Sequence, residues 1–196
     1  MTTFLLVRHG ETDAVDQWLA GWLPGVSLNA KGRRQAARLA ERLGRRPVAA
    51  IYSSPLDRAM ETATPLAEQL GLPIRELDAV GEIRMGAWEG RRLDDLAADE
   101  HWRAFNTTRA LVRPPGGELM VEVQARMVAA LLALAAEHPD RIVVVVSHLD
   151  PIRAALMYFL GMPIDAYHRL RLAPASVSTV AIGPGGAFVT AIGGSG

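Results

Sequence analysis

The sequence predicts an α/β protein of three layers, α/β/α, with a mostly parallel central sheet and a C-terminal β-hairpin. Apolar runs without alternation occur at 3–7 and 142–146, a pattern typical of strands that are covered on both faces. Segments with helical periodicity lie between the predicted strands, and this alternation favours right-handed crossovers in one sheet. Two further β segments flank Gly183-Pro184-Gly185-Gly186 and predict the hairpin.

The composition narrows the function classes. The 196 residues are 49% hydrophobic and 21% charged, which suits one globular domain over residues 1–196 with a substantial core. The 21 basic and 21 acidic residues cancel, so nothing favours nucleic-acid or membrane binding. The absence of cysteine excludes disulfides and thiolate chemistry. The first residues lack a basic signal-peptide segment and no apolar run is long enough to span a bilayer, so we expect a soluble cytoplasmic protein.

The elements follow from apolar patterns and from turn residues. Strands are expected at 3–7, 48–52, 73–77, 142–146, 177–182 and 187–192. Helices are expected at 30–43, at 55–70, at 93–105, from the proline-glycine loop at 113–118 to about 137, and at 150–160. The sequence shows no internal repeat and no linker that would divide the chain.

Several helix ends and faces are specific enough to test. Asn29 is placed to cap the first helix and Gly44 to stop it, while Asp150-Pro151 is expected as the N-cap and first-turn pair of the last helix. Pro65 is expected to kink or split the second helix. In the helix that ends near 137, the inward residues are expected to be Val123, Met127, Val128, Leu131, Leu132 and Ala135.

Two predicted strands end in charged or polar residues that include a histidine, Arg8-His9 and Ser147-His148. A third strand leads into a helix whose first turn carries Arg58. Ligands of open α/β sheets gather at the carboxyl ends of the strands. If these strands are neighbours, two imidazoles and two guanidiniums converge. Because an Arg fork matches phosphate oxygens in two-point geometry, this cluster predicts a phosphate site.

A metal site is the main chemical alternative for a pair of histidines. Such a site needs a carboxylate or a third histidine at ligand spacing. His101, His138 and His168 lie in helices or at helix ends without that pattern, and the two arginines would repel a cation. The sequence also has no P-loop and no dinucleotide-binding glycine fingerprint. We therefore predict neither a metal nor a cofactor.

Five short segments follow one another along the chain: Leu6-Val7-Arg8-His9-Gly10-Glu11-Thr12, Ser53-Ser54-Pro55-Leu56-Asp57-Arg58-Ala59-Met60-Glu61-Thr62-Ala63, Glu82-Ile83-Arg84-Met85-Gly86-Ala87-Trp88-Glu89-Gly90, Pro115-Gly116-Gly117-Glu118 and Val146-Ser147-His148. In this order they resemble the signature segments of the histidine phosphatase superfamily, the group that contains the cofactor-dependent phosphoglycerate mutases. A single Arg-His-Gly would be weak evidence, but five segments in order cover nearly the whole chain.

The resemblance implies a mechanism and a set of roles. It implies that His9 attacks phosphorus and becomes a phosphohistidine, with its other ring nitrogen held as a donor by a nearby carbonyl. Arg8, Arg58 and His148 would hold the phosphoryl oxygens, and Glu82 would protonate the leaving oxygen. Glu11 and Glu89 are alternatives for the acid, but the motif position favours Glu82.

Substrate contacts are expected from loops around this centre. The residues expected to contact the substrate are Thr12, Gly21, Trp22, Arg84, Met85 and Leu149. Trp18, Trp88 and the 99–117 region are further candidates for walls that cover the pocket. The chain also departs from the family pattern. The stretch after Thr12 lacks the family's phosphate-holding asparagine, so that Asp16 or Gln17 would have to replace it, and Leu149 stands where the family usually has glycine.

Three functions remain open at this point. The leading one is a phosphomonoesterase, of the histidine acid phosphatase type, that acts on a small phosphorylated substrate. A phosphoglycerate mutase is the close alternative, although residues 91–95 lack the basic, tyrosine-containing segment that the mutases use. The third is a non-catalytic protein that binds phosphorylated ligands. The hairpin edge can pair between subunits, so a homodimer is one expectation, but nothing in the sequence requires it.

Overall fold

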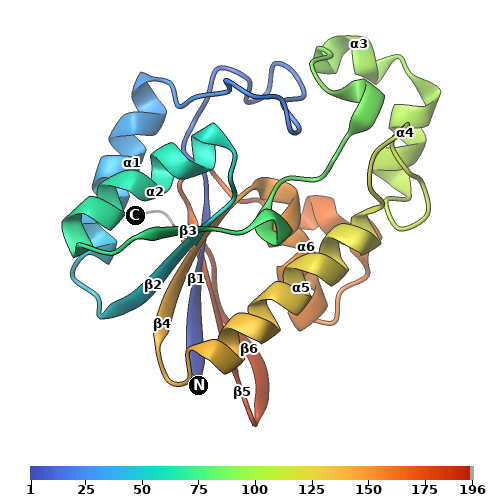
Figure 1. The fold of residues 1–196 in the computed structure, drawn as a ribbon. Coiled ribbons are helices and arrows are strands. Elements are labelled where there is room, and N and C mark those ends of the chain that lie inside the picture. Colours follow the sequence, from blue (N-terminus) through green and yellow to red (C-terminus); the bar gives the residue numbers. More distant parts are fainter. Residues whose placement is uncertain (195–196) are drawn as a thin grey trace.

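The computed structural model describes residues 1–194 and shows helices on both faces of a six-stranded sheet (Figure 1). The strands are β1 (Thr2–Arg8), β2 (Val48–Ser53), β3 (Ile74–Glu76), β4 (Ile142–Ser147), β5 (Val177–Gly183) and β6 (Gly186–Gly194). Their order across the sheet is β3-β2-β4-β1-β5-β6. The β3-β2-β4-β1 part is parallel, and β5 and β6 join it in antiparallel orientation. The predicted fold class and the closing hairpin are confirmed.

Six α-helices and three short 3-10 helices connect these strands within the described residues. The α-helices are α1 (Ala30–Leu43), α2 (Asp57–Leu70), α3 (Leu93–Ala97), α4 (Glu100–Thr107), α5 (Met120–Glu137) and α6 (Leu149–Phe159). The 3-10 helices are η1 (Asp78–Val80), η2 (Gly86–Trp88) and η3 (Ile164–Arg169). Among residues 1–194, no helix is both long and apolar enough to cross a membrane.

Strand β1 lies in the middle of the sheet and divides the core into two layers. Phe4 and Leu6 pack with residues of α5 and α6, whereas Leu5 and Val7 pack with residues of α1 and α2. All four side chains are fully buried. Because successive side chains of a strand point to opposite faces, this unbroken apolar run is what a strand covered on both sides requires.

A third apolar cluster lies beside the sheet and contains Trp88, Phe105 and Met120. The indole of Trp88 lies 5.2 Å from that of Trp102 and 5.5 Å from the ring of Phe105, measured between centroids. Trp88 is therefore a core residue of the α3–α4 region. It does not line the cavity at the carboxyl ends of the strands, where the sequence suggested it as a wall.

The predicted helix over 93–105 is wrong as a single element. The chain forms α3 and α4, and the carboxylate of Asp99 caps α4 by accepting from the backbone N–H groups of His101 and Trp102. An aspartate at this point favours a new helix start over continuation, because its side chain satisfies the free N–H groups of the next helix.

Three smaller predictions also need correction. Pro65 does not split α2, which runs unbroken because its apolar face packs on the sheet. Leu132 is 48% exposed, since it lies about 100° around the helix from the buried Leu131. The N-cap of α6 is His148, and Asp150 lies in the first turn of that helix. The predicted Asn29 cap of α1 is confirmed, because its side chain accepts from the N–H of Gly32.

Candidate active site

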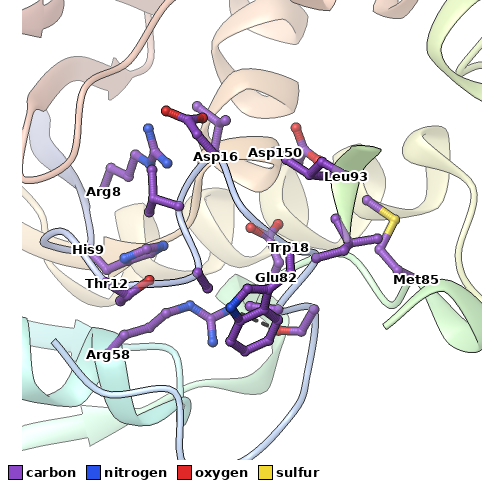
Figure 2. A pocket seen from close by; sticks show the side chains of 16 residues that line it. Arg8, His9, Thr12, Asp16, Trp18, Arg58, Glu82, Met85, Leu93 and Asp150 are labelled. Carbon is purple, nitrogen blue, oxygen red and sulfur yellow. Dashed lines mark hydrogen bonds between the residues drawn. The ribbon is translucent and has the colours of Figure 1, made fainter. Parts of the chain in front are cut away.

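The carboxyl ends of three neighbouring strands converge on one cavity (Figure 2). β1 pairs directly with β4, and Arg8 lies opposite Ser147 in that register. β2 pairs with the other edge of β4 and leads to α2. The cavity, of about 180 Å³, is lined by Arg8, His9, Thr12, Ala14, Val15, Asp16, Trp18, Leu19, Ala20, Gly21, Arg58, Glu82, Met85, Leu93, Leu149 and Asp150.

His9 has two ring nitrogens in different environments. Its Nδ1 lies 2.7 Å from the carbonyl oxygen of Gly10, and the ring is 5% exposed. A carbonyl only accepts, so Nδ1 carries the hydrogen and Nε2 keeps its lone pair. Burial, and then the positive charges of Arg58 and Arg8, hold the pKa of His9 well below its usual value. The imidazole is therefore neutral at physiological pH.

The loop around His9 is held by contacts from two helices. The N–H of Gly10 donates to Thr62 Oγ1 at 2.9 Å, and the N–H of Glu11 donates to Gln35 Oε1 at 2.8 Å. A side chain at Gly10 would meet the backbone oxygen of Gly32 at 2.8 Å, so only glycine lets the loop approach α1 this closely. These contacts fix the backbone that presents the imidazole.

Two guanidiniums flank His9 with part of their hydrogen-bonding capacity unused. Arg58 is 2% exposed and donates from Nη2 to the carbonyl of Gly21 at 2.8 Å. Arg8 donates from Nη1 to the carbonyl of Leu172 at 2.6 Å. Arg58 Nη1, Arg8 Nε and the hydroxyl of Thr12 are buried and have no partner among the described residues. Unpaired buried donors are costly, and an oxyanion in the cavity would satisfy them.

His148 lies next to His9, is fully buried and is not among the residues that line the cavity. The two ring centroids are 5.1 Å apart. His148 Nε2 lies 2.7 Å from Ser54 Oγ, while its Nδ1 is buried without a partner. Burial lowers the pKa of His148 well below its usual value, and the nearby charge of Arg58 adds to this effect. Both histidines are thus neutral, which leaves the two arginines as the positive charges of the cluster.

Glu82 faces this cluster from the loop after η1. Burial, and then the negative charge of Asp150, raise the pKa of Glu82 to about 7, although Arg58 and Arg8 act in the opposite direction. Desolvation is the larger effect here, and Glu82, which is partly buried, has no direct ion pair among the described residues. A carboxyl with such a pKa both gives and takes a proton near neutrality.

The sequence alone did not point to Arg126, which holds the backbone of the Glu82 loop. Its Nη1 donates to the carbonyls of Ala79 and Gly81, both at 2.8 Å, and its Nη2 donates to the carbonyl of Glu82 at 2.9 Å. Trp22 Nε1 donates to the same Glu82 carbonyl at 2.5 Å. Arg126, which directly precedes the apolar run at 127–136 of α5, was the only sequence signal for this contact.

The chain matches a family of known proteins. The family model of the histidine phosphatase superfamily (branch 1) matches residues 4–193, which include every residue described above. The chain belongs to the histidine phosphatase superfamily. The family resemblance of the five sequence segments is thereby confirmed. The first three segments line the cavity through Arg8, His9, Thr12, Arg58, Glu82 and Met85, whereas no residue of 115–118 or 146–148 is part of its lining.

Relatives of this superfamily member include phosphatases and a mutase. Phosphoserine phosphatase 1 of Hydrogenobacter thermophilus is 31% identical over 182 residues, covering 92% of this chain and 86% of that protein. A probable phosphoglycerate mutase of Salmonella choleraesuis is 36% identical over 191 residues, covering 92% and 85%. The structure named Bacillus stearothermophilus YhfR superimposes with a TM-score of 0.92 at 30% identity, covering 98% and 97%. Family membership and the phosphatases among the relatives support phosphoryl hydrolysis.

Other relatives are longer than this chain. It spans 49% of the length of the mycobacterial proteins that it matches at 35% identity over 181 residues, one of which is named a bifunctional protein.

The cavity of this histidine phosphatase superfamily member does not include every residue that the sequence suggested. Thr12, Gly21, Met85 and Leu149 line it. Trp22 and Arg84 do not line it, because the Arg84 guanidinium stacks on the Trp22 ring at 3.8 Å beside the Glu82 loop. Trp18 does line it, as expected for a wall.

The two alternative acids lie outside the cavity. Glu11 pairs with Lys31 at 2.6 Å, and Glu89 accepts from the backbone N–H of Met85 at 3.0 Å. Both carboxylates therefore have local structural partners. Among residues 1–194, no group of three or more His, Cys, Asp or Glu side chains is placed to hold a metal ion.

Proposed function

We propose that this protein hydrolyses small phosphomonoesters through a phosphohistidine on His9. The observation that carries the proposal is the neutral His9 ring, whose Nδ1 lies 2.7 Å from Gly10 O and whose Nε2 is thus free to attack. Two arginines, each with a buried donor that has no partner among the described residues, flank this ring. Phosphoryl transfer asks chiefly for such positioning and charge stabilisation.

The first half-reaction moves the phosphoryl group to the protein. The lone pair on His9 Nε2 forms a bond to phosphorus while the bond from phosphorus to the alcohol oxygen breaks. Arg8, Arg58 and Thr12 donate to the phosphoryl oxygens, and His148 Nδ1 is the remaining unpaired group behind them. Glu82, whose pKa of about 7 leaves much of it protonated near neutrality, gives its proton to the departing alcohol oxygen.

The second half-reaction restores the protein. Glu82 is now a carboxylate and takes a proton from a water molecule as that water attacks phosphorus. The bond from Nε2 to phosphorus breaks, and inorganic phosphate leaves. The same carboxyl serves as acid and then as base, and a pKa near the working pH suits both roles.

A mutase remains the close alternative, and the relative named as a probable phosphoglycerate mutase favours it. The lining of the cavity favours the phosphatase, because Arg8 and Arg58 are the only arginines among the described residues that line it, and both flank His9. A phosphoglycerate also carries a carboxylate, which would need further cationic partners. A non-catalytic phosphate-binding role would leave the raised pKa of Glu82 without a use.

Paired assays separate these functions. The protein is incubated with p-nitrophenyl phosphate, and separately with 3-phosphoglycerate plus a bisphosphoglycerate primer, beside His9→Ala. Release of p-nitrophenol that disappears in His9→Ala supports the phosphatase. Isomerisation without net phosphate release would establish the mutase instead. Phosphate binding without turnover would favour the non-catalytic role. Cytoplasmic location, a small phosphorylated partner and a homodimer remain proposals of the same account.

A further inference from the structure

The part of the cavity beyond the phosphate end is apolar and acidic. The apolar lining consists of Ala14, Val15, Trp18, Leu19, Ala20, Met85, Leu93 and Leu149. Its remaining charged residues, apart from Glu82 and the two arginines that flank His9, are Asp16 and Asp150. Within residues 1–194, no lysine lines the cavity. The alcohol part of a substrate, which extends away from the phosphate, must lie against this surface.

Asp16 presents a free carboxylate to the cavity. Its backbone φ is +61°, in the left-handed region that Asp tolerates better than most residues. Its side chain is exposed and makes no ion pair among the described residues. In Figure 2, Asp16 and Asp150 lie along the same side of the cavity, whereas Arg58 lies across from them. The negative charges are therefore grouped away from Arg58.

Asp150 is fixed in place by a buried cluster. Its Oδ2 accepts from Arg109 Nη1 at 2.9 Å, and its Oδ1 lies 3.9 Å from Arg153 Nη1. The Arg109 guanidinium in turn stacks 3.6 Å from the centroid of the Tyr167 ring. Oδ1 has no close hydrogen-bond partner among the described residues, so this oxygen keeps its capacity to accept from a ligand.

We propose that Asp16 and Asp150 select phosphomonoesters whose alcohol part carries an apolar body and a cationic amine. The inference rests on the proposed function and names the substrate class of the same site. An ammonium group would donate to these carboxylates, whereas a carboxylate on the substrate would meet like charge. Arg109 and Arg153 compensate part of the charge of Asp150, and Arg8 lies on the Asp16 side of the cavity. Arg84 adds no further cation to the lining, because its guanidinium stacks on Trp22.

Three aryl phosphates of nearly equal shape test the selection. They are 4-(aminomethyl)phenyl phosphate, 4-ethylphenyl phosphate and 4-(carboxymethyl)phenyl phosphate, whose charged groups are insulated from the ring by a methylene. We expect kcat/KM to fall in this order, with about tenfold between the cationic and the anionic probe, since partly exposed charge pairs have modest Coulomb energies. Asp16→Asn and Asp150→Asn should each bring the ratio closer to one, whereas Asp95→Asn, an exposed aspartate outside the cavity, should preserve it.

The outcomes distinguish a failure of the proposed substrate selection from a failure of the proposed phosphatase function. If all three probes are hydrolysed equally well, or the carboxymethyl probe best, the selection is wrong and the phosphatase stands. If none is hydrolysed, the affinities of the three probes for His9→Ala are measured by calorimetry. Tighter binding of the aminomethyl probe would support the substrate selection although the phosphatase function fails. Equal binding of the three probes would overturn the selection as well. Asp150→Asn leaves Arg109 unpaired and can destabilise the fold, so the exposed Asp16→Asn carries the test by itself in that case.

Discussion

His9 and Glu82 differ from ordinary surface residues through burial. Burial favours the neutral form of both side chains, so the histidine is a nucleophile and the glutamate an acid at the same pH. The arginines add to this effect at His9 and oppose it at Glu82, where desolvation is larger. The same environment thus favours a neutral imidazole at His9 and a protonated carboxyl at Glu82.

The pKa of Glu82 predicts how phosphorylation depends on pH. Only the protonated carboxyl can donate a proton to the leaving oxygen. The single-turnover rate of phosphorylation should therefore fall as pH rises above about 7. Glu82→Gln should lower this rate by about 10²- to 10⁴-fold for alkyl phosphates, and much less for p-nitrophenyl phosphate, whose leaving group needs little proton donation. Glu76→Gln, at an exposed position in β3, is the matched control. An unchanged pH profile in Glu82→Gln would remove Glu82 from the acid role.

The same shift predicts a pH-dependent stability. The pKa of Glu82 is raised from 4.5 to about 7 on folding, so its stabilising contribution is present below pH 4.5 and is lost as pH rises through 7. The loss is on the order of 3 kcal/mol. Urea unfolding of the native protein and of Glu82→Gln should show the stability difference shifting in favour of the variant between pH 5 and about 8. A difference that does not change with pH would contradict the raised pKa.

At the scale of elements, helix α5 positions the acid without reaching the cavity. Arg126 on this helix donates to three carbonyls of the loop that carries Glu82, and its Nε also pairs with Glu118 at 3.0 Å. The helix therefore fixes a loop that has no regular structure of its own around residue 82.

Arg126→Met should separate positioning from binding. Methionine keeps an apolar stem of similar length but loses the donors, so kcat should fall by about 10- to 100-fold with little change in KM. Arg103→Met, on the exposed side of α4, is the control and should leave both constants unchanged. A rise in KM with unchanged kcat would indicate that the loop binds substrate and does not orient the acid.

The Arg109–Asp150 pair joins the segment after α4 to α6. Both side chains are nearly buried, with side-chain exposures of 6% and 11%. Removing one partner leaves a buried charge, so Arg109→Met should cost about 3–5 kcal/mol of unfolding free energy. Arg109→Met combined with Asp150→Leu should recover a large part of that loss, as measured by urea unfolding. Additive losses would show that the two residues do not act as a pair.

At the scale of the molecule, the apolar runs predicted the sheet well. The strands at 3–7 and 142–146 are buried on both faces. Burial on both faces requires an unbroken apolar run, and such a run is visible in the sequence. The convergence of His9, Arg58 and His148 followed from their positions at or just after strand ends. Strand order itself was not readable, because it depends on pairing between distant segments.

The remaining site residues had weaker sequence signals. The sequence predicted Asp150 as a helix cap. Its place at the cavity wall depends on its contact with Arg109, which is 41 residues away in the chain. Arg84 occurs in a motif segment and Trp22 in the loop after the first one, yet they stack on each other outside the cavity. The direction of a loop side chain depends on such long-range partners, which a single sequence does not display.

Trapping the phosphoenzyme tests the central claim most directly. The protein is mixed with an aryl phosphate, quenched in alkali within one turnover and digested, and its peptides are analysed by mass spectrometry. The account predicts one phosphoryl group on the peptide that contains His9, stable in alkali, lost in acid and absent from His9→Ala. Hydrolysis without any phosphoenzyme, or a phosphoryl group on a residue other than His9, would contradict it.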